Sequence, residues 1–216
     1  MVQTIQAADV TLEDLEAEFG LKLVRDAQFF PEWMGKEQIT DAERTTLDRV
    51  QTNFLTLLKR PPILENSVKM VSLSPLLDLA GFYQEPYRIE SETSIDIQME
   101  EEGEIIRGRI DVLVLHVRLW VLVIEAKRAN FDIQVAAPQA LDYMLGNPEA
   151  RLPSFGMITN GHTFVFLKLI RQPTPQYANS RLFSLFNPGN ELYDVLGILK
   201  RMRMETSKPV STEQVI

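Results

Sequence analysis

The sequence contains no cysteine and only two histidines, His116 and His162. The absence of cysteine excludes disulfides, iron–sulfur clusters, thiolate zinc sites and a cysteine nucleophile, and it fits a reducing compartment. Neither histidine has a G-x-S-x-G-like sequence nearby, so a Ser–His–Asp triad is disfavoured. The motifs G-x-x-x-x-G-K-[ST] and G-x-G-x-x-G are also missing, which removes the main signal for phosphate-loop and Rossmann nucleotide sites.

Long apolar runs and an excess of basic residues are missing as well. The longest apolar run near the middle covers 119–124, far short of the roughly 20 residues that a membrane helix needs. Residues 1–10 have neither the basic nor the apolar region of a secretory signal, so we expect a cytoplasmic protein without membrane contact. The net charge of −8 disfavours a protein that coats nucleic acid nonspecifically, but it does not exclude a nuclease, whose groove has its own local field.

Sequence patterns divide the chain into three parts. Thr11 and Thr40 each begin a capping-box pattern, and apolar residues recur at helical spacing after the second. Pro61-Pro62 then breaks the chain. The expected organisation is a helical N-terminal extension over 1–60, one domain over 61–205 and a flexible tail over 206–216.

The domain over 61–205 shows both helical and strand periodicities. Helices are expected near 64–73, 74–81, 133–145 and 192–199. Strands are expected near 89–99, 106–115, 120–127, 155–159 and 163–169, with hairpin turns at Glu102-Gly103 and Asn160-Gly161. This pattern predicts an α/β fold, with a central mixed β-sheet flanked by helices.

Three charged residues on two of these strands suggest a chemical site. Glu125 and Lys127 are two apart in a strand, so their side chains leave the same face. Charges in so apolar a strand are costly unless they are paired, hydrated or bound to a metal. If the preceding turn is centred on Arg118, Asp111 stands opposite Glu125. A divalent cation would then remove the repulsion between the two carboxylates, and oxygen ligands with room for water suit Mg²⁺.

The register decides between this interpretation and a purely structural one. If Val117-Arg118 form a two-residue turn, Asp111 instead stands opposite Ile124 and points to the other face of the sheet. The metal hypothesis therefore needs an odd-length loop or a bulge. A buried ion pair without a metal is the alternative that the spacing leaves open.

The order of these motifs resembles a known nuclease family. Asp111 followed by Glu125-Ala126-Lys127 resembles the core of the PD-(D/E)xK nucleases. More narrowly, the stretch from Glu65 to about Leu169 resembles the N-terminal nuclease domain of the restriction subunit of type I restriction–modification enzymes. The matching features are Glu65 on the first helix, Gly108-x-x-Asp111, Gln139-x-x-x-Tyr143 and Thr159-Asn160-Gly161.

The resemblance implies a restriction-endonuclease-like core over 61–205 and Mg²⁺-dependent hydrolysis of DNA, with Mn²⁺ as a substitute. It implies metal ligands at Asp111 and Glu125 and a catalytic lysine at Lys127, with Glu65 as a further acidic site residue. DNA-binding or site-supporting residues are expected at Gln139, Tyr143, Arg109 and Arg128; Arg107 and Lys168 are further basic candidates for phosphate contact. The partners implied are DNA and other restriction–modification subunits, with a homodimer left open.

Two departures from the family leave a second function open, the first being Ile110 in place of the proline that gives the superfamily its name. The type I subunit carries a helicase motor after its nuclease, and this chain has no phosphate loop for one, so cleavage coupled to translocation is not implied. The alternative function is a non-catalytic nucleic-acid-binding or assembly module that keeps the nuclease fold. A core domain with a structural ion pair and no role with DNA is the third interpretation.

Overall fold

The computed structural model describes residues 4–31, 38–98, 105–116, 119–129, 133–148 and 152–206. The predicted turn at Glu102-Gly103 and the predicted tail beyond Thr206 lie outside these residues. The elements, in chain order, are β1 (Thr4–Gln6), η1 (Ala7–Asp9), α1 (Leu12–Phe19), β2 (Lys22–Leu23), η2 (Ala27–Phe29), α3 (Asp41–Leu57), α4 (Glu65–Val68), η3 (Lys69–Leu73), α5 (Ser74–Leu79), β3 (Tyr87–Gln98), β4 (Ile105–His116), β5 (Leu119–Ala126), η4 (Ile133–Ala136), α6 (Ala137–Leu145), β6 (Ser154–Thr159), β7 (Thr163–Ile170), β8 (Gln176–Asn179), β9 (Phe183–Ser184) and α7 (Leu192–Thr206).

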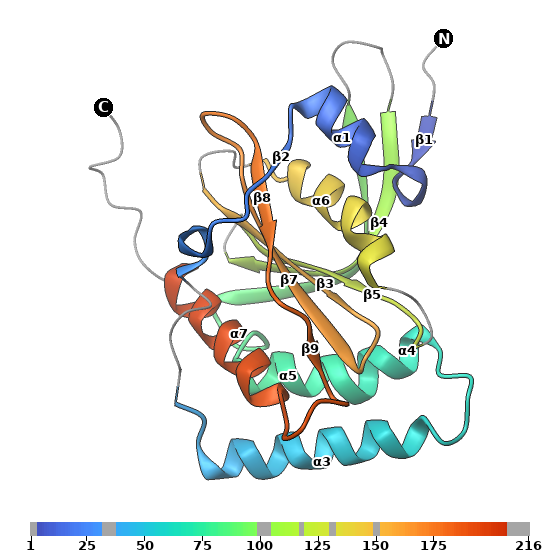
Figure 1. The fold of residues 1–216 in the computed structure, drawn as a ribbon, viewed down its shortest axis with the longest axis vertical. Helices are drawn as coiled ribbons and strands as arrows, with labels where there is room; N and C mark the ends of the chain where they lie inside the picture. The colour runs from blue at the N-terminus through green and yellow to red at the C-terminus, as the bar shows by residue number, and fades with distance from the viewer. Residues whose placement is uncertain are drawn as a thin grey trace.

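A mixed sheet runs through the middle of the described structure (Figure 1). Its nine strands follow the order β1-β4-β5-β6-β7-β8-β2, with β3 paired to β4 and β9 paired to β7. The pairs β3–β4, β4–β5 and β6–β7 are antiparallel, whereas β5 and β6 are parallel and are joined through α6. A parallel pair needs such a crossover because its two strands start at the same end. The predicted mixed α/β fold is therefore confirmed.

Helices cover both faces of the sheet, so the protein has two cores. Helices α3, α5 and α7 lie on one face, and α1 and α6 lie on the other (Figure 1). Neighbouring residues of a strand belong to different cores. On β4, Val114 belongs to the first core and Leu113 to the second; on β7, Phe166 belongs to the first and Val165 to the second. This division follows from the pleat, which sends successive side chains to opposite faces. Among the described residues, none of the helices has the length and apolar character that a membrane span requires.

The first 60 residues are less helical and more integrated than predicted. β1 pairs in parallel with β4, and β2 pairs in parallel with β8. Helix α1 packs in the same hydrophobic core as α6, and α3 packs in the core on the opposite face of the sheet. The helical periodicity over 1–60 therefore did not predict these two strands. Strands of two or three residues are too short for an alternating pattern to reveal them.

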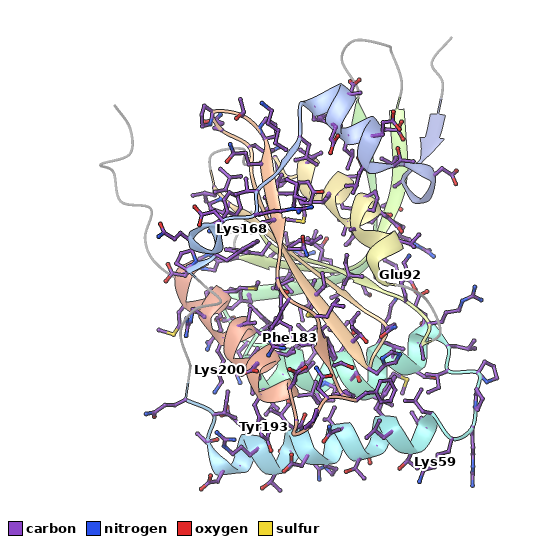
Figure 2. The ribbon with its side chains drawn as sticks, viewed as in Figure 1. Lys59, Glu92, Lys168, Phe183, Tyr193 and Lys200 are labelled. Carbon is purple, nitrogen blue, oxygen red and sulfur yellow. The ribbon has the colours of Figure 1, made fainter. Side chains whose placement is uncertain are left out.

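A buried lysine contacts the aromatic residues at the end of η2. Lys168 on β7 is 5% exposed, and its ammonium donates a hydrogen bond to the carbonyl of Phe29 at 3.0 Å. The same ammonium lies 5.6 Å from the ring centre of Phe29, 6.0 Å from that of Phe30 and 5.9 Å from that of Phe155. Such cation–π contacts stabilise a desolvated ammonium. The prediction that Lys168 could approach a phosphate is wrong, since the residue anchors the N-terminal segment (Figure 2).

One continuous helical segment replaces the two helices expected around Pro75. α4, η3 and α5 follow one another without a break, and η3 is a π turn whose last bond runs from the Ser74 N–H to the Lys69 carbonyl. Proline lacks an N–H and crowds the carbonyl four residues before it. The wider π turn before Pro75 lets the helix pass the proline, and such turns are frequent at functional sites.

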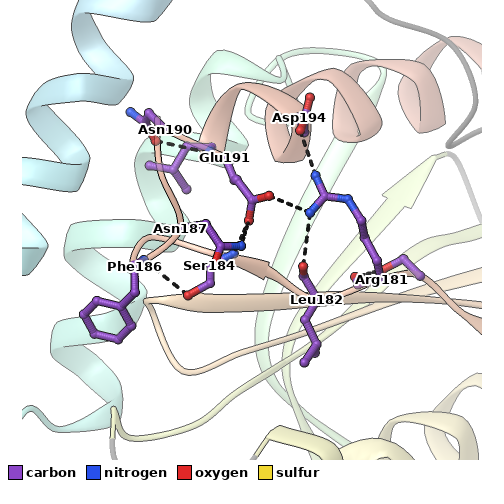
Figure 3. A network of polar contacts seen from close by, with 10 residues as sticks. Arg181, Leu182, Ser184, Phe186, Asn187, Asn190, Glu191 and Asp194 are labelled. Carbon is purple, nitrogen blue, oxygen red and sulfur yellow. Dashed lines mark hydrogen bonds and ion pairs between the residues drawn. The ribbon is translucent and has the colours of Figure 1, made fainter.

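A charged network fixes the start of α7 to the preceding loop (Figure 3). The Arg181 guanidinium lies 2.6 Å from a Glu191 oxygen and 2.9 Å from an Asp194 oxygen. The second Glu191 oxygen accepts hydrogen bonds from the Ser184 N–H and the Asn187 amide. Partial burial favours the neutral form of Glu191, but these donors outweigh it and lower the pKa of its carboxyl. The network therefore has a structural role at neutral pH.

The Thr159-Asn160-Gly161 motif is a structural turn between β6 and β7. The Gly161 N–H donates to the Thr159 hydroxyl, and the Thr163 N–H donates to the Asn160 side-chain oxygen. Gly161 has φ +90° and its carbonyl accepts a hydrogen bond from the Ser72 hydroxyl at 2.8 Å. The turn therefore ties the β6–β7 hairpin to the π turn of η3.

Gly161→Ala is expected to destabilise the fold by about 3 kcal/mol, from backbone strain and overpacking together. A Cβ at this position would lie 2.3 Å from the Phe54 ring and 3.2 Å from Val68. Gly189→Ala is the matched control, because Gly189 has φ +86° but nothing within 4 Å of an added Cβ. Urea denaturation of both variants separates the clash from the strain, and equal losses would refute the clash with Phe54.

Candidate active site

The predicted site residues gather at a fork in the sheet beside β4. β3 pairs with β4 along one edge from Ile105 to His116. On the other edge, β1 pairs with β4 up to Arg107 and β5 pairs with it from Val112 onward. The segment Gly108–Asp111 lies between these two partners, where the two strands separate.

A bulge in β5 sets the register at this fork. Close to the turn, Leu115 pairs with Trp120, which is the register that a two-residue turn gives. The register then shifts by one residue, so that Val121 is skipped and Val112 pairs with Ile124. A bulge adds one residue to one strand and moves every later side chain to the opposite face of the sheet. The sequence argument required an odd loop or a bulge, and the structure contains the bulge.

The last pair of this register is Val112 with Ile124. If the register continues for one more pair, Asp111 stands opposite Glu125, and directly opposed positions share a face of the sheet. The Asp111 carboxylate is 14% exposed. The side chain of Glu125 lies outside the described part of the structure, so a cation shared by the two carboxylates stays a prediction.

Lys127 belongs to a chain of hydrogen bonds that returns to β4. Its backbone N–H donates to the Thr159 carbonyl at 2.7 Å, which fixes the residue just after β5. Its ammonium donates to the Gln139 side-chain oxygen at 3.0 Å, and the Gln139 amide nitrogen donates to the Tyr143 hydroxyl at 2.8 Å. That hydroxyl also accepts from the Arg109 backbone N–H at 3.1 Å. Helix α6 therefore presents Gln139 and Tyr143, four residues apart on one face, to the fork.

Lys69, on the helical segment before β3, contacts Asp111 directly. The Lys69 ammonium lies 2.7 Å from an Asp111 oxygen and 3.2 Å from a Glu65 oxygen. Burial opposes the charged form of Lys69, but hydrogen bonds and attraction from Asp111 and Glu65 outweigh this effect and raise the pKa of its ammonium. Glu65, one of the predicted site residues, is therefore linked to Asp111 through one shared cation.

The two predicted arginines lie near the fork but are open to solvent. Arg109 has a side chain that is 63% exposed and lies 3.5 Å from a carboxylate oxygen of Glu92 on β3. Arg128 follows Lys127 directly and is also exposed. Glu92 has a positive φ of 55° in the middle of a strand, and a non-glycine residue there is a strained position of the kind found at functional sites. The side chain of the third candidate, Arg107, lies outside the described residues.

The charges at this fork fit a cation. Among the side chains that the structure describes, no three acidic or histidine groups are close enough to enclose a metal. Glu65 and Asp111 nevertheless share the ammonium of Lys69, which occupies the place of a cation between two oxygen donors. Carboxylate oxygens are the ligand type that Mg²⁺ and Mn²⁺ prefer.

Lys69 and Glu92 are the site neighbours that sequence reasoning missed. The spacing of Glu65 and Lys69 does indicate an ion pair on one helix face, but it gives no sign of a contact with Asp111, 42 residues further along. The strained backbone of Glu92 has no sequence signal, because glutamate does not favour positive φ.

Tyr143→Phe is expected to lower stability by about 2 kcal/mol, because it leaves the Arg109 N–H and the Gln139 amide without their acceptor. Tyr143 is 1% exposed, so water cannot easily replace the hydroxyl. Tyr83→Phe is the control, since the Tyr83 hydroxyl contacts the Ser74 hydroxyl at the surface. Chemical denaturation of both variants provides the comparison, and equally small losses would show that the bonds of Tyr143 contribute little.

Comparisons with known proteins found a family model and solved structures that are similar to this chain. The family model described as type I restriction enzyme R protein N terminus matches residues 12–174. Among solved structures, the chain is similar to a fragment of an HsdR subunit of a type I restriction enzyme from Vibrio vulnificus YJ016. The identity is 23% and the TM-score 0.39, and the match covers 63% of this chain and 26% of that chain. No curated protein matched.

Proposed function

The chain belongs to the family of type I restriction enzyme R protein N-terminal domains, whose model matches 12–174 of its 216 residues, and we propose that it is a metal-dependent nuclease that hydrolyses DNA phosphodiester bonds. The match covers 26% of the similar solved chain. For this chain, the activity and the partners of a whole R subunit are therefore proposals.

One observation supports the proposal above all others. The bulge in β5 gives the register that, continued for one pair beyond Val112–Ile124, puts Glu125 opposite Asp111, and the hydrogen bonds of Lys127 lead back to β4 two residues from Asp111. Residues from two strands and one helix thus converge on a single fork in the sheet.

Asp111 and Glu125 would hold the metal, with Glu65 close to them. Asp111 and Glu65 already share a positive charge, so the surroundings favour a cation. When bound, Mg²⁺ or Mn²⁺ supplies a Lewis acid that polarises a phosphate oxygen and makes water a better nucleophile at neutral pH.

Lys127 stabilises the negative charge that develops on the phosphate. Its ammonium is directed by the Gln139 side-chain oxygen. The Gln139 amide is in turn oriented, because its nitrogen donates to Tyr143. Donors that are fixed before the reaction act most strongly on developing charge, so Gln139 and Tyr143 act as positioning residues.

Arg109 and Arg128 are the candidates for contact with the DNA backbone. Both are exposed beside the fork, and arginine suits phosphate because its planar donors bind two oxygens at once. With a net charge of −8, DNA affinity depends on such local contacts. We propose further restriction–modification subunits as partners that supply additional affinity, and a second copy of the chain is the other candidate.

A plasmid-nicking assay tests this function. Purified protein should convert supercoiled DNA to the open form in Mg²⁺ or Mn²⁺ and should lose this activity in excess chelator. Asp111→Asn should be inactive, whereas Asp78→Asn, which changes an exposed residue of α5, should cleave like the unchanged protein. DNA binding without metal-dependent cleavage would overturn the proposal in favour of a non-catalytic module.

A further inference from the structure

Lys69 sits where it can control access to Asp111. Its side chain is 18% exposed and contacts Asp111 at 2.7 Å and Glu65 at 3.2 Å. The Asp111 contact joins residues 42 apart in sequence, so it depends on the tertiary fold rather than on helix geometry alone. Hydrogen bonds between charged groups are about twice as strong as neutral ones.

The backbone around Lys69 is fixed on both sides of the residue. Lys69 is the first residue of the π turn η3, and Ser72 in the same turn donates to the Gly161 carbonyl at 2.8 Å. Before the helix, the Ile63 carbonyl accepts from the Ala129 N–H at 3.3 Å, two residues after Lys127. The helical segment is thus attached to the end of β5 and to the β6–β7 turn, which keeps Lys69 directed at β4.

An ammonium and a divalent cation cannot both use the same Asp111 oxygen at low cost. Two cations on one oxygen would lie within about 4 Å of each other, a distance at which like charges repel strongly in a partly buried site. Two further charges at the fork, Arg109 and Glu92, face each other across β3 and β4 and offset one another.

We propose that Lys69 is an internal counter-cation that occupies Asp111 in the metal-free protein and is displaced when a divalent cation binds. This inference rests on the metal-dependent function proposed above. Without metal, Lys69 offsets part of the negative charge of Asp111 and Glu65, and it weakens metal binding because the Lys69–Asp111 contact has to break first. The flexible stem of lysine allows the ammonium to move while its helix stays in place.

Calorimetric titration of Mn²⁺ into chelator-treated protein tests the displacement. Lys69→Met should bind Mn²⁺ roughly tenfold more tightly, since a charge-assisted hydrogen bond no longer has to be broken. Lys69→Arg keeps a competing cation and should bind no more tightly than the unchanged protein. Lys59→Met makes the same change in net charge at an exposed position after α3 (Figure 2), so its affinity should not change. Asp111→Asn should abolish binding in every background.

The possible outcomes distinguish this inference from the proposed function. Equal affinity of Lys69→Met and the unchanged protein, or weaker binding by Lys69→Met, would overturn the displacement while leaving a metal site at Asp111. Absence of Mn²⁺ binding in all variants would instead overturn the metal-dependent function.

A second measurement needs no substitution and therefore does not depend on the folding of a variant. An amine-reactive reagent followed by mass spectrometry should label Lys69 slowly without metal, because its ammonium is held by Asp111 and Glu65. Saturating Mg²⁺ should increase the labelling of Lys69 severalfold and leave that of Lys59 unchanged. Labelling of Lys69 that stays constant in a protein shown to bind metal would contradict its displacement.

Discussion

Lys127→Met is expected to reduce DNA cleavage by about a hundredfold or more, the usual effect of removing one fixed donor from developing negative charge. Methionine keeps most of the stem of the side chain but has no ammonium to place beside a phosphate. The hydrogen bond to Gln139 is lost as well, and a change of this kind costs only about 1–3 kcal/mol. Activity should therefore fall far more than stability does.

The same variant separates a catalytic lysine from a structural counter-ion. If Lys127 only balanced buried carboxylates, its loss should cost about 3–5 kcal/mol, and activity would fall only as far as the protein unfolds. Nicking rates and denaturation midpoints in Mg²⁺ on one preparation decide between these outcomes. Lys22→Met, at an exposed position of β2, is the control. A fully active Lys127→Met protein would rule out the catalytic role.

Asp142→Asn is expected to change the dependence of stability on pH. Asp142 lies on α6, is 0% exposed, and neither of its carboxylate oxygens has a hydrogen-bond partner. Burial raises its pKa to about 7 from 3.8. Between these values the folded protein keeps a proton that the unfolded chain releases, so stability falls as the pH rises from about 4 to about 7 and is constant above that.

The size of this effect follows from the pKa difference. At 1.36 kcal/mol for each pH unit, the ionised carboxyl costs the folded protein about 4 kcal/mol above pH 7. The stability of Asp142→Asn relative to the unchanged protein should therefore increase by about 4 kcal/mol between pH 4 and pH 8. The buried amide of the variant also changes the free energy of unfolding, but by an amount that does not depend on pH. Urea denaturation across this range measures it, with Asp78→Asn as an exposed control. Parallel curves for the two variants would show that Asp142 is not destabilising when ionised.

Much of the sheet could be predicted from sequence because its strands carry local signals. Alternation identified β3 and β4, the dense apolar run identified β5, and Asn160-Gly161 identified the β6–β7 turn. The strands β1, β2, β8 and β9 were not predicted, since two to four residues hold no periodic signal. They form because longer strands offer them free edges.

The candidate site shows where local reasoning ends. The Gln139–Tyr143 pair could be foreseen, because a helix places i and i+4 on one face and the two residues are indeed hydrogen-bonded. The bulge at Val121 could be stated only as a requirement, because bulges are set by packing between strands. The contact of Lys69 with Asp111 was not predicted at all, since it depends on a π turn and on how the helical segment attaches to the sheet.

The most direct test of the central claim is the position of a bound metal. Crystals of the protein soaked in Mn²⁺ should give an anomalous peak at the fork of the sheet, about 2.1 Å from one carboxylate oxygen each of Asp111 and Glu125. Lys69 should have left Asp111 in the same map. A peak elsewhere, no peak at saturating Mn²⁺, or a Glu125 side chain directed to the face of the sheet away from Asp111 would contradict the proposed active site.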